Sequence, residues 1–184
     1  MLIHNLDLIP QSFKDGIRAI FLLHRNKDGE SGNAQRKSIK RVSRNAKEWH
    51  EIVSHFAILQ QDSYSGHRIY ASVNSRCMEK AVREFKRRQL DNDYAAGDIK
   101  DWFYVDIQNT FLSCLMNPSC RNEGNFLIDC DTNEQLKDAL KIIPKNFIIF
   151  DYPTKNGHHI ITHPFNPNDY QGLEIKKDDL MYLG

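Results

Sequence analysis

The chain has 184 residues, 40% of them hydrophobic, which is enough for one globular domain or for two small ones. Its 25 basic and 24 acidic residues leave a net charge of +1, which argues neither for nor against a polyanionic partner. No apolar run approaches the length of a membrane span or a signal-peptide core, so we expect a cytoplasmic protein without a membrane partner. The absence of paired spacing predicts free thiols at Cys77, Cys114, Cys120 and Cys130.

The N-terminal part of the chain, residues 1–120, is expected to form an α/β unit. Its apolar pattern predicts a strand at 16–25, a helix from about Asn45, a strand at 67–76, and helices at 77–92 and 101–118. The Gly- and Ser-containing residues after the first strand are predicted to form a loop. In the first helix Trp49, Val53 and Phe56 recur at helical spacing, and Pro118 is expected to end the last helix. The second helix is expected to bury Ala81, Val82, Phe85 and Leu90.

Residues 121–184 show a clearer pattern. It predicts a strand at 125–131, a helix at 132–143, a strand at 146–153, a turn at 154–157, a strand at 158–165 and a last strand within 172–183. Asp131 or Thr132 is the expected N-cap of the helix. The order β-α-β-β with a further strand is typical of a ferredoxin- or RRM-like half. The expected fold is a single α+β domain, residues 1–184, in which the N-terminal unit packs on this RRM-like half.

The stretch "FLIDCD", residues 126–131, places two carboxylates at the end of an apolar run. Alternate side chains of a strand share a face, so Asp129 and Asp131 point in the same direction. Two neighbouring carboxylates repel, and the pKa of one rises unless a cation lies between them. The pattern therefore indicates a metal site, a dyad that shares a proton, or an exposed strand end in which Asp131 caps the following helix.

A histidine pattern follows in "HHIITHPF", residues 158–165. If this strand pairs with the one that carries the two acids, His159 lies on the face of Asp129 and Asp131. The predicted helix covers the other face of such a sheet, and the face of the acids is expected to be free for chemistry. His158 and His163 are interpreted as structural.

The order of these motifs resembles the archaeo-eukaryotic primase superfamily, which includes replicative primases, phage and plasmid primase-polymerases, and the polymerase domains of bacterial end-joining ligases. The resemblance is carried by "LIDCD" for the paired acids and by "TKNGHHII", with His159 in the histidine position. The strand "RIYASVNSR" also looks like an upstream strand of some relatives. The match covers the last sixty residues well, and its specificity comes from motif order and spacing.

The resemblance implies a nucleotidyltransferase in which a 3′-hydroxyl attacks a nucleoside triphosphate at a site with two Mg²⁺ or Mn²⁺ ions. Asp129, Asp131 and a third acid would hold these ions, and His159 would contact the nucleotide. The third acid would be Asp178, with Glu174 and Asp179 as alternatives. The implied catalytic residues are Asp129, Asp131, His159 and Asp178, and the implied nucleotide-binding residues are Thr154, Lys155, Gly157, His159 and Arg76.

Two basic stretches could contact a single-stranded DNA or RNA template through its phosphates. The residues concerned are Arg36, Lys37, Lys40, Arg41, Arg44, Arg87 and Arg88. A solvated charged face is the alternative interpretation. A protein of this kind would need a separate helicase as partner, as in phage and mobile-element systems that divide these functions between chains.

Two other classes of function stay open. One is a non-catalytic nucleic-acid-binding protein of the same fold, in which no third acid faces Asp129 and Asp131. The other is a metal-dependent nuclease or phosphoesterase, since paired acids and a histidine also suit hydrolysis. A pocket in which Lys155 and Arg76 converge on a triphosphate would favour the nucleotidyltransferase.

Overall fold

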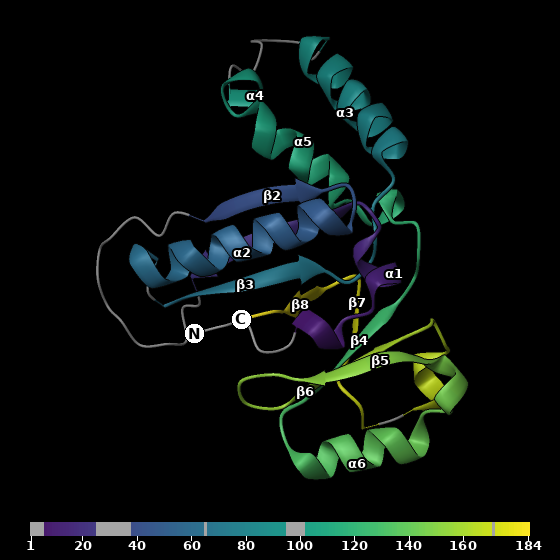
Figure 1. Cartoon of the computed structure of the whole chain (residues 1–184). Coiled ribbons are helices and arrows are strands. Elements are labelled where there is room, and N and C mark those ends of the chain that lie inside the picture. The colour runs from purple at the N-terminus through teal and green to yellow at the C-terminus, as the bar shows by residue number, and fades with distance from the viewer. Residues whose placement is uncertain (1–5, 25–37, 65, 95–101, 171) are drawn as a thin grey trace. The chain divides into compact units, whose positions relative to one another are not determined.

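The computed structural model describes residues 6–24, 38–64, 66–94, 102–170 and 172–184. The fold is α+β, and the described strands form two four-stranded antiparallel sheets (Figure 1), ordered β2-β1-β3-β8 and β5-β6-β4-β7. The chain divides into two compact units, one made of residues 1–74 and 124–184 and the other of residues 75–123. Within the described ranges, no helix has the length and apolarity that crossing a membrane requires.

Most of the helices and strands occur in the predicted order. The strands are β1 (Arg18–His24), β2 (Ile39–Ser43), β3 (His67–Ser72), β4 (Phe126–Cys130), β5 (Ile148–Pro153), β6 (His158–Thr162), β7 (Ile175–Lys177) and β8 (Leu180–Tyr182). The helices are α1 (Gln11–Lys14), α2 (Ala46–Asp62), α3 (Met78–Asp93), α4 (Trp102–Val105), α5 (Ile107–Leu115) and α6 (Asn133–Ile142). Short 3-10 helices are η1 (Leu6–Leu8), η3 (Pro118–Cys120), η4 (Lys145–Phe147) and η5 (Pro167–Asp169).

The first sheet is packed against α2. The side chain of Asn45 caps this helix by accepting a hydrogen bond from the backbone of Glu48, at 3.0 Å. The predicted apolar face is confirmed, because Trp49, Val53 and Phe56 are fully buried in the core. A helical period in the sequence thus located both the helix and its buried face.

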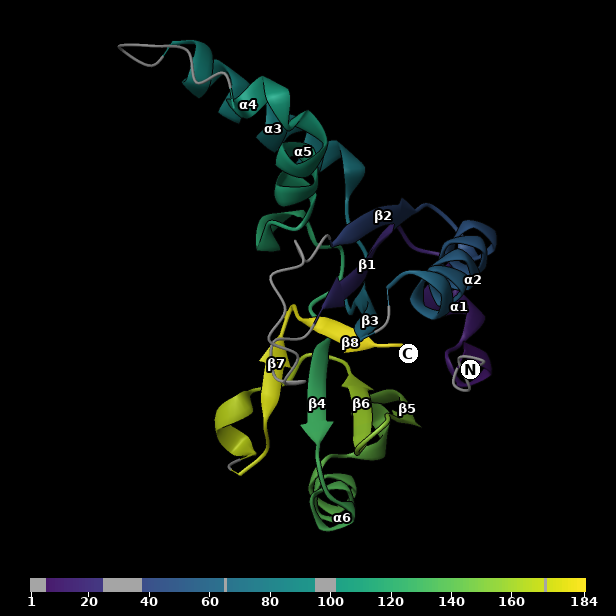
Figure 2. The same cartoon turned by 90° about the vertical axis from the view of Figure 1, so that its left-hand side faces the viewer.

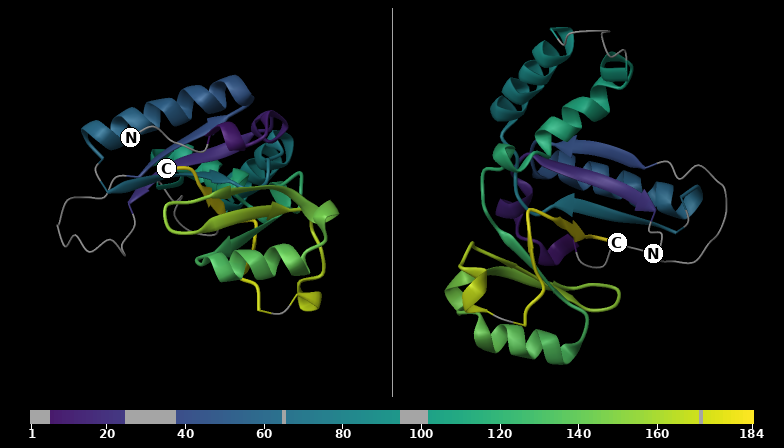
Figure 3. Two further views of the ribbon diagram at one scale, coloured as in Figure 1. Left: turned by 60° about the horizontal axis from the view of Figure 1, so that its bottom comes forward. Right: turned by 180° about the vertical axis from the view of Figure 1, so that it is seen from behind.

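The second sheet is covered on one face by α6 (Figure 3). Thr132 is the N-cap, and it forms a reciprocal capping box with Gln135. Ala139 and Ile143 pack against Ile128 and Ile160 in a small core of their own. The structure therefore selects Thr132 over Asp131 as the residue that caps this helix.

The opposite face of the second sheet is not free, which corrects the expectation from the sequence. Leu127, Phe150 and Ile161 belong to the same buried cluster as residues of the first sheet and α2. The expectation failed because a single strand pattern does not show that a second sheet covers that face. Asp129 therefore shares its face of β4 with the buried Leu127.

Three other elements differ from the prediction. β2 lies where a loop was expected, since its basic residues hide the alternation of an edge strand. The predicted helix at 101–118 is two helices, α4 and α5. The predicted last strand is two strands in different sheets, β7 and β8 (Figure 2), and Asp178 between them has a φ of 57°. A positive φ reverses the chain locally, which lets it leave one sheet and join the other.

The second compact unit contains α3, α4 and α5. Phe85 of α3 stacks on Phe103, with ring centroids 5.5 Å apart, and meets the edge of Phe111 at 5.7 Å. Ala81 is buried as expected, whereas Leu90 is 55% exposed, contrary to the prediction. The apolar spacing thus predicted the helix correctly, but the buried face predicted from it was one turn too long.

Candidate functional site

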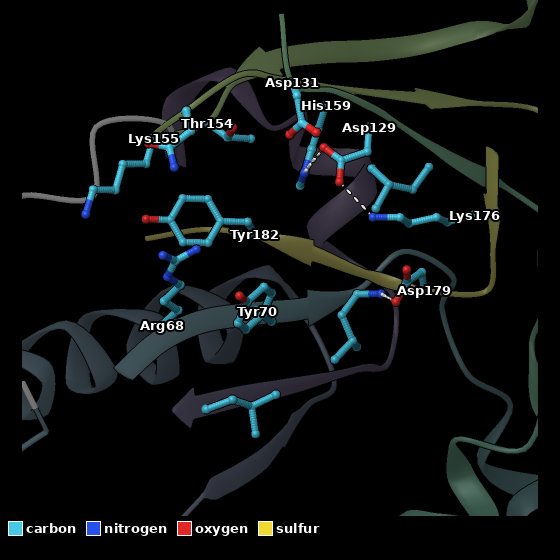
Figure 4. A pocket seen from close by; sticks show the side chains of 14 residues that line it. Arg68, Tyr70, Asp129, Asp131, Thr154, Lys155, His159, Lys176, Asp179 and Tyr182 are labelled. Carbon is cyan, nitrogen blue, oxygen red and sulfur yellow. Dashed lines mark hydrogen bonds and ion pairs between the residues drawn. The ribbon is translucent and has the colours of Figure 1, made fainter. Parts of the chain in front are cut away.

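A cavity of about 380 Å³ in the first unit gathers polar side chains from both sheets (Figure 4). β4 and β6 pair in the register that places Asp129 directly opposite His159, so the condition under which His159 shares the face of the acids is met. The volume lies in the range of small-molecule sites. Polar residues that line the cavity on the side of the second sheet are Asp129, Asp131, Thr154, Lys155, Asn156, His159 and Lys176.

Asp129 is the most strongly bonded group of the cavity. Its Oδ2 atom accepts a hydrogen bond from Nζ of Lys176 at 2.7 Å, and its Oδ1 atom lies 3.4 Å from Nε2 of His159. Interactions with His159 and then Lys176 hold the pKa of this carboxyl well below its usual range. Lys176 also contacts Glu174 at 3.1 Å. Asp129 is therefore ionised throughout the physiological pH range.

His159 is held in place by a buried tyrosine. The hydroxyl of Tyr152 donates to the backbone carbonyl of Tyr182 at 2.8 Å and lies 2.7 Å from Nδ1 of His159. A hydroxyl has one proton, so a hydroxyl that donates to the carbonyl must accept its second hydrogen bond from Nδ1–H. This assigns one proton of His159 to Nδ1 and directs Nε2 at the carboxylate of Asp129. Burial, followed by the negative charge of Asp129, raises the pKa of Tyr152 well above its usual value, which keeps the hydroxyl protonated.

Asp131 lies at the cavity with an exposed side chain. Its backbone N–H donates to Oε1 of Gln135 at 2.8 Å, so the capping box of α6 fixes the backbone of this residue. Since Thr132 caps the helix, the carboxylate of Asp131 is available at the cavity together with that of Asp129. Figure 4 shows both acids and His159 at the same end of the cavity.

The turn between β5 and β6 brings Thr154 and Lys155 to the cavity wall. The backbone N–H of Thr154 donates to the carbonyl of Gly157 at 2.8 Å, and the N–H of Gly157 donates to Oγ1 of Thr154 at 3.1 Å. A Cβ atom on Gly157 would lie 2.2 Å from the carbonyl oxygen of Cys130. The glycine is required because this turn approaches the end of β4 so closely.

The three candidates for a third acid occupy different positions. Asp179 lines the cavity, and its Oδ1 atom accepts from the backbone of Leu180 at 2.7 Å. Asp178 is not among the lining residues and accepts from the side chain of Asn74 at 3.2 Å. Glu174 pairs with Lys176. Asp179 is thus the candidate that shares the cavity with Asp129.

One nucleotide-binding residue implied by the resemblance, Arg76, is not among the lining residues of the cavity. Arg76 is fully buried in the second compact unit, where it donates to the carbonyl of Met116 at 3.5 Å. A convergence of Arg76 and Lys155 in one pocket would have favoured a triphosphate site. Arg76 does not line the cavity, so this convergence is not found there.

The predicted template-binding residues are largely engaged in local ion pairs. Arg44 pairs with Glu48, while Arg87 and Arg88 share Glu84 and lower the pKa of that carboxyl to about 2. Lys40 and Arg41 lie on the edge strand β2. Two further predicted residues, Arg36 and Lys37, lie outside the described residues.

The residues that line the cavity can be compared with the ligands that a divalent cation requires. In the part of the chain that the structure describes, no three His, Cys, Asp or Glu side chains gather as a metal site would require. Asp129 and Asp131 nevertheless line one cavity. Mg²⁺ is commonly held by one or two carboxylates together with substrate phosphates rather than by a cage of protein ligands. The donor set fits an ion whose coordination is completed by phosphate, and it does not fit an ion held by protein alone.

The sequence did not single out several residues that line or support the cavity. Lys176 shares a strand face with Glu174 and could have been noticed as the cation nearest to the paired acids. Tyr152 is opposite His159 in the register of β5 and β6, a pairing that the short turn between those strands implies. The first sheet contributes Arg68, Tyr70 and Tyr182 to the cavity. The sequence around these residues did not indicate that they belong to a site.

No protein-family model matches the chain, and no curated protein and no solved structure is significantly similar to it. The resemblance to the primase superfamily therefore depends on the two short motifs, "LIDCD" and "TKNGHHII". In the structure, both motifs contribute residues to the same cavity. That arrangement is the observation from which a function can be inferred.

Proposed function

We propose that the cavity binds the triphosphate of a nucleotide and that the protein is a nucleotidyltransferase of the primase-polymerase type. The observation that carries the proposal is the shared cavity of Asp129, Asp131, His159, Thr154 and Lys155. These residues come from two motifs about thirty positions apart, whose order and spacing the resemblance rests on. Local signals that agree with one another are better evidence than any one of them.

The cavity offers suitable groups for each part of a triphosphate. Lys155, which is exposed at the rim, supplies positive charge, and Lys176 supplies more beside Asp129. The hydroxyl of Thr154 and the backbone of its turn supply further polar contacts for phosphate oxygens. Nε2 of His159 points toward the acids, at the end of the cavity where the phosphate groups would lie.

Asp129 and Asp131 are the residues that would hold Mg²⁺ or Mn²⁺ together with the triphosphate. The ion, when bound, would lower the pKa of an attacking 3′-hydroxyl and neutralise the departing pyrophosphate. The Tyr152–His159 hydrogen bond would keep Nε2 oriented while the nucleotide enters. Catalysis of this kind depends mainly on positioning and charge, which the described side chains supply.

The arrangement of the second sheet supports the RRM-like half that the resemblance implies. β4 and β6 are its central strands, with β5 and β7 at the edges, and α6 connects β4 to β5. This is the strand arrangement of a split β-α-β unit. In the proposed function, its two central strands carry Asp129 and His159.

A second candidate function is a nucleic-acid-binding protein without catalysis. The ion pair between Lys176 and Asp129 favours it, because a lysine occupies one carboxylate oxygen that a metal would need. The lack of a three-residue metal group among the described residues also favours the non-catalytic protein. This candidate predicts no metal-dependent step at all.

Calorimetric titration of Mn²⁺, with and without a nucleoside triphosphate, separates these possibilities. The variants are the double substitution Asp129→Asn/Asp131→Asn and the control Asp151→Asn, which removes an exposed acid of β5 that does not line the cavity. We expect Mn²⁺ to bind weakly alone and at least about tenfold more tightly with the triphosphate, since phosphate oxygens complete its coordination. The double variant should lose this enhancement and the control should keep it.

The other results would overturn the proposal in distinct ways. Mn²⁺ binding that ignores the triphosphate would indicate a nuclease or phosphoesterase. No Mn²⁺ binding by the wild type under either condition would indicate the non-catalytic binding protein. If the enhancement is found, incorporation of labelled nucleotide on a primed single-stranded template is the next measurement.

A further inference from the structure

Two chemically different walls face the cavity. Asp129, Asp131, His159 and the lysines come from the strands and turns of the second sheet, whereas Arg68, Tyr70 and Tyr182 come from β3 and β8 of the first sheet (Figure 4). We call these last three residues the aromatic wall. The phosphate-binding groups of the proposed function account for the first wall only, so the second needs its own explanation.

The aromatic wall is built by strand register. Tyr70 and Tyr182 are direct partners of β3 and β8, and their ring centroids lie 5.8 Å apart at an interplanar angle of 65°. The guanidinium carbon of Arg68 lies 5.9 Å from the ring centroid of Tyr182. Contacts of this length are typical of edge-to-face aromatic pairs and of cation–π pairs.

These aromatic residues are not part of the hydrophobic core. They alternate along their strands with Ile69, Met181 and Leu183, which are fully or almost fully buried. Tyr70 and Tyr182 are only partly buried, and both line the cavity. A cross-strand tyrosine pair that served the sheet alone would not need to line a cavity shared with three acids and two lysines.

We propose that the aromatic wall stacks against a nucleobase, and this inference rests on the proposed function of the opposite wall. Every base has a π face, so stacking on tyrosine and arginine tolerates any sequence. A nucleotide with its triphosphate beside Lys155 and the acids would direct its base away from them, toward Tyr182. The wall would therefore make the cavity selective for nucleotides over other polyphosphates without selecting one base.

Tyr182 is connected to the catalytic candidates by its backbone. Its carbonyl accepts the hydrogen bond of Tyr152, which in turn contacts His159. Substitution of the Tyr182 side chain leaves that carbonyl in place. A variant at this position therefore tests stacking without removing the support of His159.

The test compares a nucleoside triphosphate with inorganic tripolyphosphate by calorimetry in Mn²⁺. We expect the wild type to prefer the nucleotide by about 5- to 150-fold, the factor that one base–aromatic stack of ~1–3 kcal/mol provides. Tyr182→Ala should bind the nucleotide as weakly as tripolyphosphate, with the tripolyphosphate affinity unchanged. Tyr182→Phe, which keeps the ring, and Tyr94→Ala, whose side chain is 83% exposed in the other unit, should behave as the wild type.

Should Tyr182→Ala fail to fold, Tyr182→Leu keeps an apolar side chain beside Tyr70 and still removes the aromatic face. Equal affinity of the wild type for both ligands, or a preference that survives in these variants, would overturn the inference while leaving the proposed function intact. Binding of neither ligand by the wild type would overturn both.

The affinity for an oligonucleotide without a triphosphate shows whether the stacked base comes from a nucleic-acid strand or from a free nucleotide. If the affinity for the oligonucleotide depends on Tyr182 and the affinity for the nucleotide does not, the stacked base belongs to a nucleic-acid strand. If the reverse holds, it belongs to the incoming nucleotide. The first result would overturn the inference, which places the base of the bound nucleotide on the aromatic wall, and the second result supports it.

Discussion

Asp129 receives polar contacts from His159 and Lys176, and these favour its charged form. Its pKa in the folded protein therefore lies below the value of about 3.9 expected in the unfolded chain. A carboxyl of this kind stabilises the fold above the unfolded pKa, and the contribution is lost as the pH falls toward the folded pKa. The charge of Asp129 is thus linked to the stability of the whole first unit.

From this linkage we predict that the difference in unfolding free energy between wild type and Asp129→Asn is largest above about pH 5 and shrinks in more acid solution. Urea unfolding of both proteins across this pH range measures the difference. The control is Asp138→Asn, an exposed acid on α6, for which no comparable pH dependence is expected. A wild-type advantage independent of pH would show that Asp129 acts through packing rather than charge.

Tyr152 gives a second prediction at the residue scale. Tyr152→Phe keeps the buried ring on Phe150 but removes the hydroxyl that joins His159 to the carbonyl of Tyr182. Leaving buried polar atoms without this partner should cost about 1–3 kcal/mol of unfolding free energy. Denaturant unfolding measures this loss, and Tyr94→Phe, at a position that is 83% exposed, is the matched control. A loss no larger than that of the control would mean that the hydroxyl bond contributes little.

At the scale of elements, the turn between β5 and β6 depends on one glycine. In Gly157→Ala the new methyl would overlap the carbonyl of Cys130, so the turn must move away from β4. We expect a loss of about 1–3 kcal/mol of unfolding free energy and weaker triphosphate binding, because Thr154 and Lys155 move with the turn. Gly124→Ala is the control, since its methyl would meet only Pro164 at an ordinary 3.7 Å. Equal stability of the two variants would contradict the close approach.

The elements also show what a single sequence can predict. Period-2 alternation located β4 and β6, so Asp129 and His159 could be expected on one face if these strands pair, and the short turn made the pairing of β6 with β5 predictable. β2 was missed because an edge strand rich in basic residues resembles a loop. The division of the last strand between two sheets was missed because a local pattern does not encode the partner of a strand.

The same distinction holds for the site. The half of the cavity that comes from residues close in sequence, including Asp131 and Lys155, was predicted from motifs. The aromatic wall was not, since Tyr70 and Tyr182 meet only through the pairing of strands more than a hundred residues apart. Arg76 was assigned to the nucleotide on resemblance, whereas the structure buries it in the second compact unit.

At the scale of the whole molecule, the second compact unit is an insertion into the first. Asn74 and Asn125 flank it, and the side chain of Asn74 bonds to both the N–H and the carbonyl of Asn125, at 2.7 and 3.1 Å. The chain thus leaves the first unit and returns to it at nearly the same point. All of the residues that line the cavity belong to the first unit.

We therefore predict that replacing residues 75–123 with a short Gly/Ser linker leaves a protein that unfolds cooperatively and still binds triphosphate. Insertions whose ends are adjacent are removable because closing the chain across them costs little entropy. Thermal unfolding and calorimetry measure the two properties. The same deletion in an Asn74→Ala background is the comparison, and it should be less stable because it lacks the bonds that join the two ends. Loss of cooperative unfolding in the first variant would show that the first unit depends on the inserted one.

β8 pairs with β3, although the two strands are separated by most of the sequence. During synthesis, β1, β2 and β3 leave the ribosome long before β8, and an N-terminal domain would ordinarily fold at that stage. Here the first sheet lacks an edge strand and the cavity lacks Tyr182 until the ribosome has passed residue 182. A nascent chain exposes the unpaired edge of β3 for this interval, which makes early binding of a chaperone more useful to this protein than to one built from contiguous units. The cavity is consequently complete only after residue 182 has been translated.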